Sequence, residues 1–284
     1  MSYRIIGDSC CDLTQQYKED PHYRLVPLTL QVDDTYIRDD ETFDQAHFLQ
    51  LVRESKAVQK SACPSPEDFM AVYEGEEDMV FVVTLSQHLS GTYNSAVLAR
   101  NLYYEEHPDS QKKIHVFSSD SACCGEALIA FKIQEMAEAG ASFEEIVEQV
   151  GDFRDHMNTY FVLETLDFLR KNGRLTGLTA ILASALNIKP VMGADHGVII
   201  KLDQARGITK ALNKLCDTVV QDAIKNGLNT KERILGIVHC NCPERAKSVK
   251  EQICSRLSFK DVYVAPAAGV SSLYAGDGGI VIAL

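Results

Sequence analysis

The sequence predicts an α/β protein with two domains, an N-terminal domain on a mostly parallel sheet and a C-terminal domain on a mixed sheet. The chain has 284 residues, and at roughly 150 residues per domain this length suggests two domains. In the first half, short apolar runs alternate with longer amphipathic stretches, which is the pattern of βαβ units. In the second half, a turn between two apolar runs indicates an antiparallel hairpin. We place the boundary after residue 157, which gives domains 1–157 and 158–284.

Four apolar runs in the first half are rich in β-branched or aromatic residues, as is typical of buried strands. They span residues 3–7, 25–32, 79–84 and 114–117. Thr42 is predicted to cap a helix that carries Phe43, Phe48, Leu49 and Val52. Ser65 precedes a proline and two acids, and Ser142 precedes Glu145 at the spacing of a capping box. Each of these serines is therefore predicted to begin a helix.

The second half begins with a predicted strand over residues 160–163, after which Thr165 is expected to cap a short helix. Gly173 suits the left-handed position that follows such a helix. The runs 188–194 and 198–202 flank Asp195-His196-Gly197, a turn sequence that predicts a hairpin and so an antiparallel pair. The remaining predicted elements are a helix over 208–226, a strand over 234–239, a helix opened by Pro243, and strands over 262–264 and 280–284.

Composition and charge exclude several classes of protein. Lys and Arg number 28 and Asp and Glu number 40, so the net charge is −12, and such a chain repels a nucleic-acid backbone. No apolar run approaches the roughly 20 residues that span a bilayer, and the N-terminus lacks the apolar region of a signal peptide. We therefore expect a cytoplasmic protein with no membrane span and no nucleic-acid partner. The nine cysteines are expected to be small buried thiols rather than a metal or redox site.

Hydroxyl-rich turns follow three of the predicted strands. They cover residues 8–9, 84–92 and 118–121. Because ligands of open parallel sheets bind beyond the carboxyl ends of the strands, these turns predict a site for a small polar or anionic group. The amides after Ser90 also precede a helix, whose N-terminus favours an anion. The alternative is that the hydroxyls only cap helices.

The motifs of several enzyme classes are absent from the sequence. It contains no Walker phosphate loop, no dinucleotide-binding fingerprint, no G-x-S-x-G elbow and no H-E-x-x-H zinc signature. His88 lies two residues before Ser90, so an esterase-like hydrolase that uses this pair is an alternative. Hydroxyls without an assignable base or metal favour binding over catalysis.

Six segments in order resemble the motifs of the DegV family, and together they span nearly the whole chain. They lie at residues 8–13, 60–66, 89–95, 120–121, 169–175 and 187–191. The resemblance implies two α/β domains with a long-chain fatty acid, such as palmitate, stearate or oleate, in a buried tunnel between them. It also implies a non-catalytic protein without a cofactor or metal. Several members of the family carry the acyl group for a separate ATP-dependent fatty-acid kinase subunit.

The resemblance assigns the fatty-acid carboxylate to hydroxyl side chains. Ser61 stands where the family has the Thr of Thr-Ser-Gln-Pro, although Ala62 and Cys63 replace the residues that follow. Ser90 and Thr92 belong to the Ser-Gly-Thr-Tyr motif, and Ser271 stands where the family often has His.

Further expectations concern the surroundings of this site. The resemblance implies that Arg170 and Arg174 lie near the pocket mouth, where they would meet a partner or its acyl-phosphate product. The alternative is that they only balance a helix dipole. The apolar residues at helical spacing could belong to the core, the lipid wall or both; they are Leu178, Ile181, Leu182 and Leu186. A last alternative is a regulatory protein in which the lipid is a structural filler.

Overall fold

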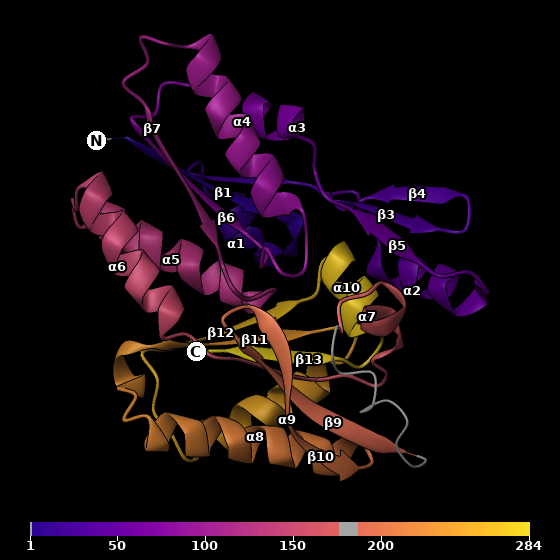
Figure 1. Ribbon diagram of the computed structural model, residues 1–284. Coiled ribbons are helices and arrows are strands. Elements are labelled where there is room, and N and C mark those ends of the chain that lie inside the picture. The colour runs from indigo at the N-terminus through magenta and orange to yellow at the C-terminus, as the bar shows by residue number, and fades with distance from the viewer. Residues whose placement is uncertain (1, 176–186) are drawn as a thin grey trace.

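The strands of the protein form three sheets in a computed structural model that describes residues 2–175 and 187–284 (Figure 1). The expected α/β architecture, with a parallel N-terminal sheet and a mixed C-terminal sheet, is confirmed. The predicted apolar face over residues 178–186 lies outside the described residues. No helix of the described residues is both long and apolar enough to span a bilayer.

The first sheet has the strand order β2-β1-β6-β7, and all neighbouring strands are parallel. Its elements are β1 (Tyr3–Asp8), β2 (Tyr23–Val26), β6 (Met79–Thr84) and β7 (Lys113–Ser118), with helices α3 (Pro66–Tyr73), α4 (Thr92–Glu106), α5 (Cys124–Glu138) and α6 (Phe143–Asp155). Because alternate strand residues point to opposite faces, Ile6 packs with residues of α3 and α4, whereas Ile5 packs with residues of α5. Helices on both faces explain why the two central strands are buried along nearly their whole length, β6 at every position and β1 at all but Arg4.

The predicted strand over residues 25–32 is wrong, because it is two strands in different sheets. β2 ends at Val26, Pro27 follows, and β3 joins the antiparallel sheet β4-β3-β5. Proline cannot donate to a ladder, so the chain changes sheets there. The elements of this region are η1 (Ser9–Cys11), α1 (Gln15–Lys18), β3 (Thr29–Val32), β4 (Thr35–Arg38), α2 (Gln45–Glu54) and β5 (Lys60–Ala62).

The predicted cap of α2 is also wrong. Asp44, not Thr42, caps this helix, and its carboxylate accepts the His47 N–H at 3.0 Å. The Thr42 N–H and hydroxyl instead donate to Asp40 in the preceding turn. Both residues are good caps, so the sequence alone does not separate them. The predicted capping boxes at Ser65 and Ser142 are confirmed.

The third sheet has the order β10-β9-β8-β13-β11-β12 and is antiparallel except between β11 and β12. Its strands are β8 (Thr159–Val162), β9 (Ile188–Asp195), β10 (Val198–Arg206), β11 (Ile234–His239), β12 (Asp261–Pro266) and β13 (Ile280–Ala283). The other elements are α7 (Asp167–Lys171), α8 (Ile208–Lys225), η3 (Thr230–Glu232), α9 (Pro243–Cys254) and α10 (Gly269–Ala275). The predicted hairpin is confirmed, and His196 and Gly197 at its tip have φ of 44° and 79°.

Helix α5 packs between the first and third sheets. It contacts β1 and β6 on one side and β11 and β13 on the other (Figure 1). Ten of its 15 residues are buried, as is typical of a helix that is covered all round. One cluster of buried apolar residues therefore continues through both halves of the chain. The strands before residue 158 belong to the first two sheets and the later ones to the third, and the domain boundary at 157/158 stays a prediction.

Candidate functional site

The three polar turns come together beyond the carboxyl ends of β1, β6 and β7, as the sequence predicts. The Leu85 N–H donates to Asp8 Oδ2 at 2.9 Å, and the Ser86 N–H donates to the Ser121 carbonyl at 2.9 Å. Some hydroxyls are used inside the turns, since Ser119 Oγ donates to the Ser121 carbonyl at 3.0 Å. Local capping thus explains part of the pattern, while other hydroxyls reach an adjoining pocket.

The pocket has a volume of about 100 Å³ and lies where this edge of the parallel sheet meets the third sheet. Most of its wall is apolar, including Leu28, Leu85, Phe161, Leu163, Ile199 and Val281. The β9–β10 hairpin lines one side of the pocket with Gly197 and its neighbours. Its tip packs closely on Ser86, whose Oγ donates to the Gly197 carbonyl at 3.0 Å. Four of the six candidate site residues from the sequence line this one pocket: Ser61, Ser90, Arg174 and Ser271.

Two hydroxyl pairs lie at the pocket. Strand β5 places Ser61 opposite Leu30 of β3, and Ser61 Oγ lies 2.8 Å from the hydroxyl of Tyr274. Ser90 Oγ lies 2.8 Å from Thr92 Oγ1, and the Thr92 N–H donates to Ser90 Oγ at 3.3 Å. Thr92 is fully buried and is not part of the pocket wall, so it positions Ser90.

Arg174 is the cation of the pocket wall. Its guanidinium lies 5.5 Å from the centre of the Tyr274 ring, its Nε donates to the Leu89 carbonyl at 3.1 Å, and its Nη1 donates to the Asn172 carbonyl. In the described ranges no carboxylate forms an ion pair with it. The wall's other charged residue, Asp120, lies 3.8 Å from the Nε of Arg154. Within residues 2–175 and 187–284, Arg174 thus has no acidic side chain as a counter-ion.

Ser271 reaches the pocket from α10 but is only 3% exposed. Its Oγ lies 3.5 Å from the sulfur of Cys10 and 3.4 Å from that of Cys123. A hydrogen bond to Cys123, together with burial, raises the pKa of the Cys10 thiol well above its usual value. These thiols are therefore neutral and form a packed partner for the Ser271 hydroxyl. Six of the nine cysteines are buried, as expected.

Two buried carboxylates from the N-terminal half hold the start of α10. Asp39 accepts the Gly269 N–H at 2.6 Å and the Val270 N–H at 2.8 Å, one on each oxygen. Asp12 accepts the Ala268 N–H at 2.6 Å. The first turn of a helix has N–H groups without partners in the helix, and carboxylates there also match the helix dipole. The position of α10, and so of its pocket residues, depends on these contacts.

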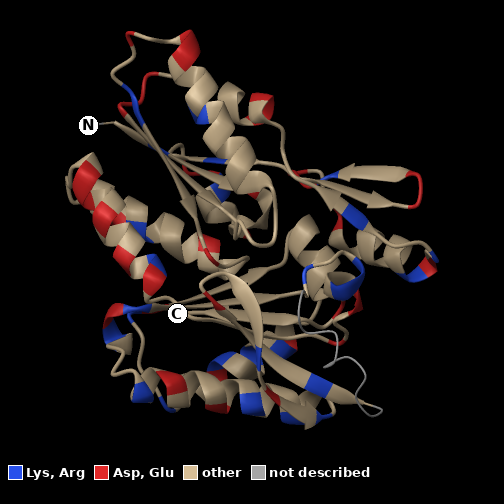
Figure 2. Cartoon of the chain, in the orientation of Figure 1, with Lys and Arg blue, Asp and Glu red and all other residues tan. Residues whose placement is uncertain are grey.

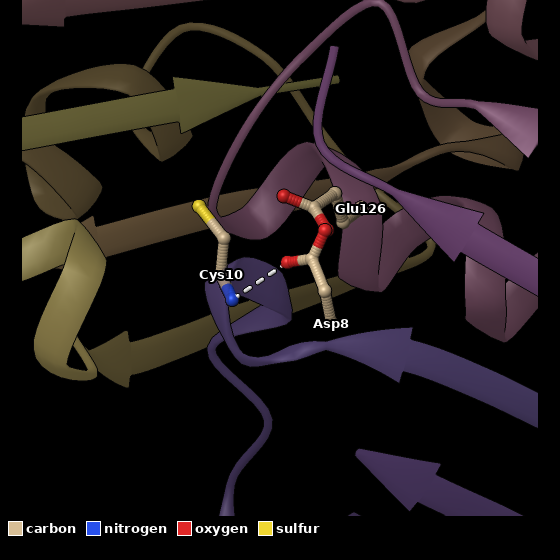
Figure 3. Close-up of side chains that lie close together, drawn as sticks. All are labelled: Asp8, Cys10 and Glu126. Atoms are coloured by element: carbon tan, nitrogen blue, oxygen red, sulfur yellow. Dashed lines mark hydrogen bonds between the residues drawn. The ribbon is translucent and has the colours of Figure 1, made fainter. Parts of the chain in front are cut away.

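Asp8, Cys10 and Glu126 form a buried cluster (Figure 3), of which Cys10 belongs to the pocket wall. Their ligand atoms lie within 4.8 Å of one another, so within the described residues these are the groups that could hold a metal ion. Burial raises the pKa of Asp8 to about 6 and that of Glu126 well above its usual value. Asp8 accepts the N–H groups of Cys10 and Leu85, whereas neither Glu126 oxygen has a partner among described atoms. The raised pKa favours the neutral form of the Glu126 carboxyl, which avoids a second buried negative charge beside Asp8.

Two sequence candidates lie away from this arrangement. Arg170 on α7 is not part of the pocket wall, and its Nη2 pairs with Asp167 at 3.0 Å. Helix α7 contacts α10 and is one of the basic segments in Figure 2. No hydrogen bond in the described chain joins the His88 ring to Ser90, whose hydroxyl is paired with Thr92. The structure therefore does not assemble the Ser–His pair of the hydrolase alternative.

Comparison with known proteins identifies the family. The model of the DegV family, described as an uncharacterised protein family, matches residues 2–284. The chain belongs to the DegV family. A DegV domain-containing protein of Streptococcus pneumoniae serotype 4 is 34% identical over 285 residues, which cover 99% of this chain and 98% of that protein.

Solved structures of DegV proteins resemble the chain over its whole length. A DegV protein of Ruminococcus gnavus, described with vaccenic acid, is 46% identical with a TM-score of 0.95, and the match covers 100% of both chains. The Fatty Acid Kinase B3 protein of Streptococcus pneumoniae, described as loaded with linoleic acid, is 33% identical with a TM-score of 0.88, covering 100% of this chain and 99% of that one.

Sequence reasoning found Ser271 but missed Tyr274, the other residue that α10 contributes to the pocket wall with a hydroxyl group. Tyr274 contacts Ser61 although the two residues are 213 positions apart. The helix is seven residues long and is preceded by Ala268 without a side-chain cap, so it lacks the usual signals. The sequence also gives no direct signal that two carboxylates bind the start of α10. Asp12 stands out in the sequence only as part of a family motif, and nothing near Asp39 in the sequence indicates its contact with α10.

Proposed function

We propose that this DegV protein binds a long-chain fatty acid in the pocket and presents its carboxylate to a separate ATP-dependent kinase subunit. The supporting observation is the combination of an apolar wall with a polar corner that holds Ser61, Ser90 and Arg174. Such concave, mostly apolar sites with a few placed polar groups are typical of small-molecule binding. The similar structures described with vaccenic and linoleic acids agree with this ligand class.

The proposed carboxylate ligands are Ser61, Ser90 and Ser271, with Thr92 holding Ser90. A hydrogen bond to a charged group contributes about 1.5–3 kcal/mol. A chain with about fifteen buried methylenes contributes roughly 12 kcal/mol at about 0.8 kcal/mol each, before ordering costs. The tail therefore supplies most of the affinity, and the hydroxyls orient the headgroup. A buried tunnel between two domains stays part of the proposal.

The proposed kinase partner rests on the likeness to the Fatty Acid Kinase B3 protein. In this proposal the chain supplies no catalytic residue and needs no cofactor. Arg170 is exposed beside α10 and would face the partner.

Mass spectrometry of the purified protein, native and then denatured, tests the ligand class. We expect release of near-stoichiometric palmitate, stearate, oleate or a similar acid. The mass of the ligand-free protein in both states, with no uptake of added oleate or palmitate, would contradict the proposal.

A Ser61→Ala/Ser90→Ala double variant tests the headgroup assignment. We expect oleate affinity to fall about a hundredfold or more, since two charge-assisted bonds are lost. Wild-type occupancy and affinity in this variant would show that the carboxylate lies elsewhere.

The same protein samples test the two alternatives. Hydrolysis of nitrophenyl esters that disappears in Ser90→Ala or His88→Ala would favour the hydrolase. A lipid that binds only the native state must raise its melting temperature, so an unchanged melting temperature after delipidation would count against the structural-filler alternative.

A further inference from the structure

Helix α10 presents two hydroxyls to the pocket, and their surroundings differ. Ser271 and Tyr274 are three residues apart and so lie on one face of the helix. The Ser271 hydroxyl is 3% exposed and lies between two neutral thiols. The Tyr274 hydroxyl lies 2.8 Å from Ser61 Oγ, the first of the proposed carboxylate ligands. A ligand that reaches Ser61 is therefore adjacent to Tyr274.

The charge of the pocket wall points to the same corner. Arg174 lies over the Tyr274 ring, and backbone carbonyls of Leu89 and Asn172 fix its guanidinium. It is the cation of the wall, and no carboxylate pairs with it in residues 2–175 and 187–284. Leu89 is also the residue before Ser90, so the contact ties the guanidinium to the second proposed hydroxyl. A partly desolvated cation without a counter-ion favours an anion beside it.

We propose that Tyr274 and Arg174 complete the headgroup site, Tyr274 by donating its hydroxyl to the carboxylate beside Ser61 and Arg174 by supplying the positive charge. Ser271, whose hydroxyl lies between the sulfurs of Cys10 and Cys123, then contributes less to carboxylate binding than Tyr274 does. This inference rests on the proposed function, because it requires a fatty acid in the pocket. It adds that the site recognises the ionised headgroup, so a neutral alcohol of the same chain length is bound without this contribution.

The test compares oleate with oleyl alcohol by calorimetric titration of the delipidated full-length protein. Tyr274→Phe keeps the ring under Arg174 and removes only the hydroxyl. We expect it to bind oleate about tenfold or more weakly, which is the loss of one charge-assisted bond, while its affinity for oleyl alcohol changes less than threefold. Arg174→Gln should reduce the preference for oleate over oleyl alcohol. Ser271→Ala should cost less oleate affinity than Tyr274→Phe.

The matched control is Tyr36→Phe on the exposed strand β4, whose side chain is 69% exposed, and it should bind both ligands as the wild type does. Thermal unfolding of each variant verifies that it is folded. Oleate affinity in Tyr274→Phe within twofold of wild type would overturn the inference while leaving the proposed function intact. Equal losses for oleate and the alcohol would also overturn it, because they indicate a packing role. A wild type that binds neither ligand would overturn both proposals.

Discussion

We expect the Asp39→Ala substitution to lower the free energy of unfolding strongly, although Asp39 itself lies in neither a helix nor a strand. The Asp39 carboxylate is 4% exposed and accepts the first two N–H groups of α10, at 2.6 and 2.8 Å. Ala leaves both N–H groups buried without a partner. Each charge-assisted bond contributes about 1.5–3 kcal/mol, so the gross loss is about 3–6 kcal/mol.

Part of this loss is offset by the cost of burying the carboxylate. Burial raises the pKa of Asp39. The ionised carboxylate is therefore less stable at this site than in water, and removing it recovers part of that free energy. We therefore expect the free energy of unfolding to fall by about 2–4 kcal/mol. At a urea dependence of about 3 kcal/mol per molar, the midpoint moves down by about 1 M.

The measurement is urea unfolding followed by far-ultraviolet circular dichroism. Asp44→Ala is the matched control, since this exposed aspartate also accepts a backbone N–H at a helix start, at 3.0 Å. An exposed cap of this kind contributes about 1 kcal/mol. A loss in Asp39→Ala no larger than in Asp44→Ala would refute the reasoning that the buried carboxylate holds α10. Oleate affinity should also fall in Asp39→Ala, because α10 carries pocket residues, and remain unchanged in Asp44→Ala.

Two further predictions follow from buried titratable groups. Burial raises the pKa of Asp8 to about 6 and that of Asp12 to about 7, from 3.8. At these two groups the native state thus binds more protons than the unfolded state between about pH 4 and 7, so they make the free energy of unfolding fall as the pH rises through this range. Burial lowers the pKa of His115 to about 4, and this group acts in the opposite direction. Urea unfolding of Asp12→Asn isolates the aspartate contribution, and the same change in stability between pH 5 and pH 8 as in the wild type would contradict the prediction. Of the nine thiols, Cys63 and Cys254 are exposed and should react rapidly with a disulfide reagent, Cys242 more slowly, and the buried ones only after unfolding. Rapid reaction of four or more thiols in the native protein would be inconsistent with the structure.

The local signals of the sequence predicted most elements of the fold. The capping boxes at Ser65 and Ser142 and the hairpin at His196-Gly197 depend on residues a few positions apart, and all are confirmed. Residues 25–32 were wrongly predicted as one strand because their apolar and β-branched composition outweighed the strand-breaking signal of Pro27. A proline within an apparent strand should lower that assignment, and here it marks the change of sheet.

The candidate site was only partly predictable, for a physical reason. Ser61, Ser90 and Ser271 were found through family motifs, but their partners are set by tertiary contacts. The Ser61 hydroxyl meets Tyr274, and the Ser271 hydroxyl meets two thiols, across more than 140 residues in each case. Periodicity reports the face on which a residue lies and does not report which distant element covers that face. The uncompensated charge of Arg174 is likewise visible only when its neighbours are placed.

The position of β13 has a consequence for the synthesis of the protein. This strand follows every other strand in the sequence, yet it lies inside the third sheet between β8 and β11. A ribosome makes about 5–20 residues per second, N-terminal residues first. The strand that pairs with both β8 and β11 is therefore complete only when residue 283 has been made. Helix α10 is translated just before β13. The nascent parallel sheet can form early, whereas the pocket that α10 lines is completed among the last steps. If the proposed fatty acid binds there, a ribosome-bound chain stalled before α10 should carry none.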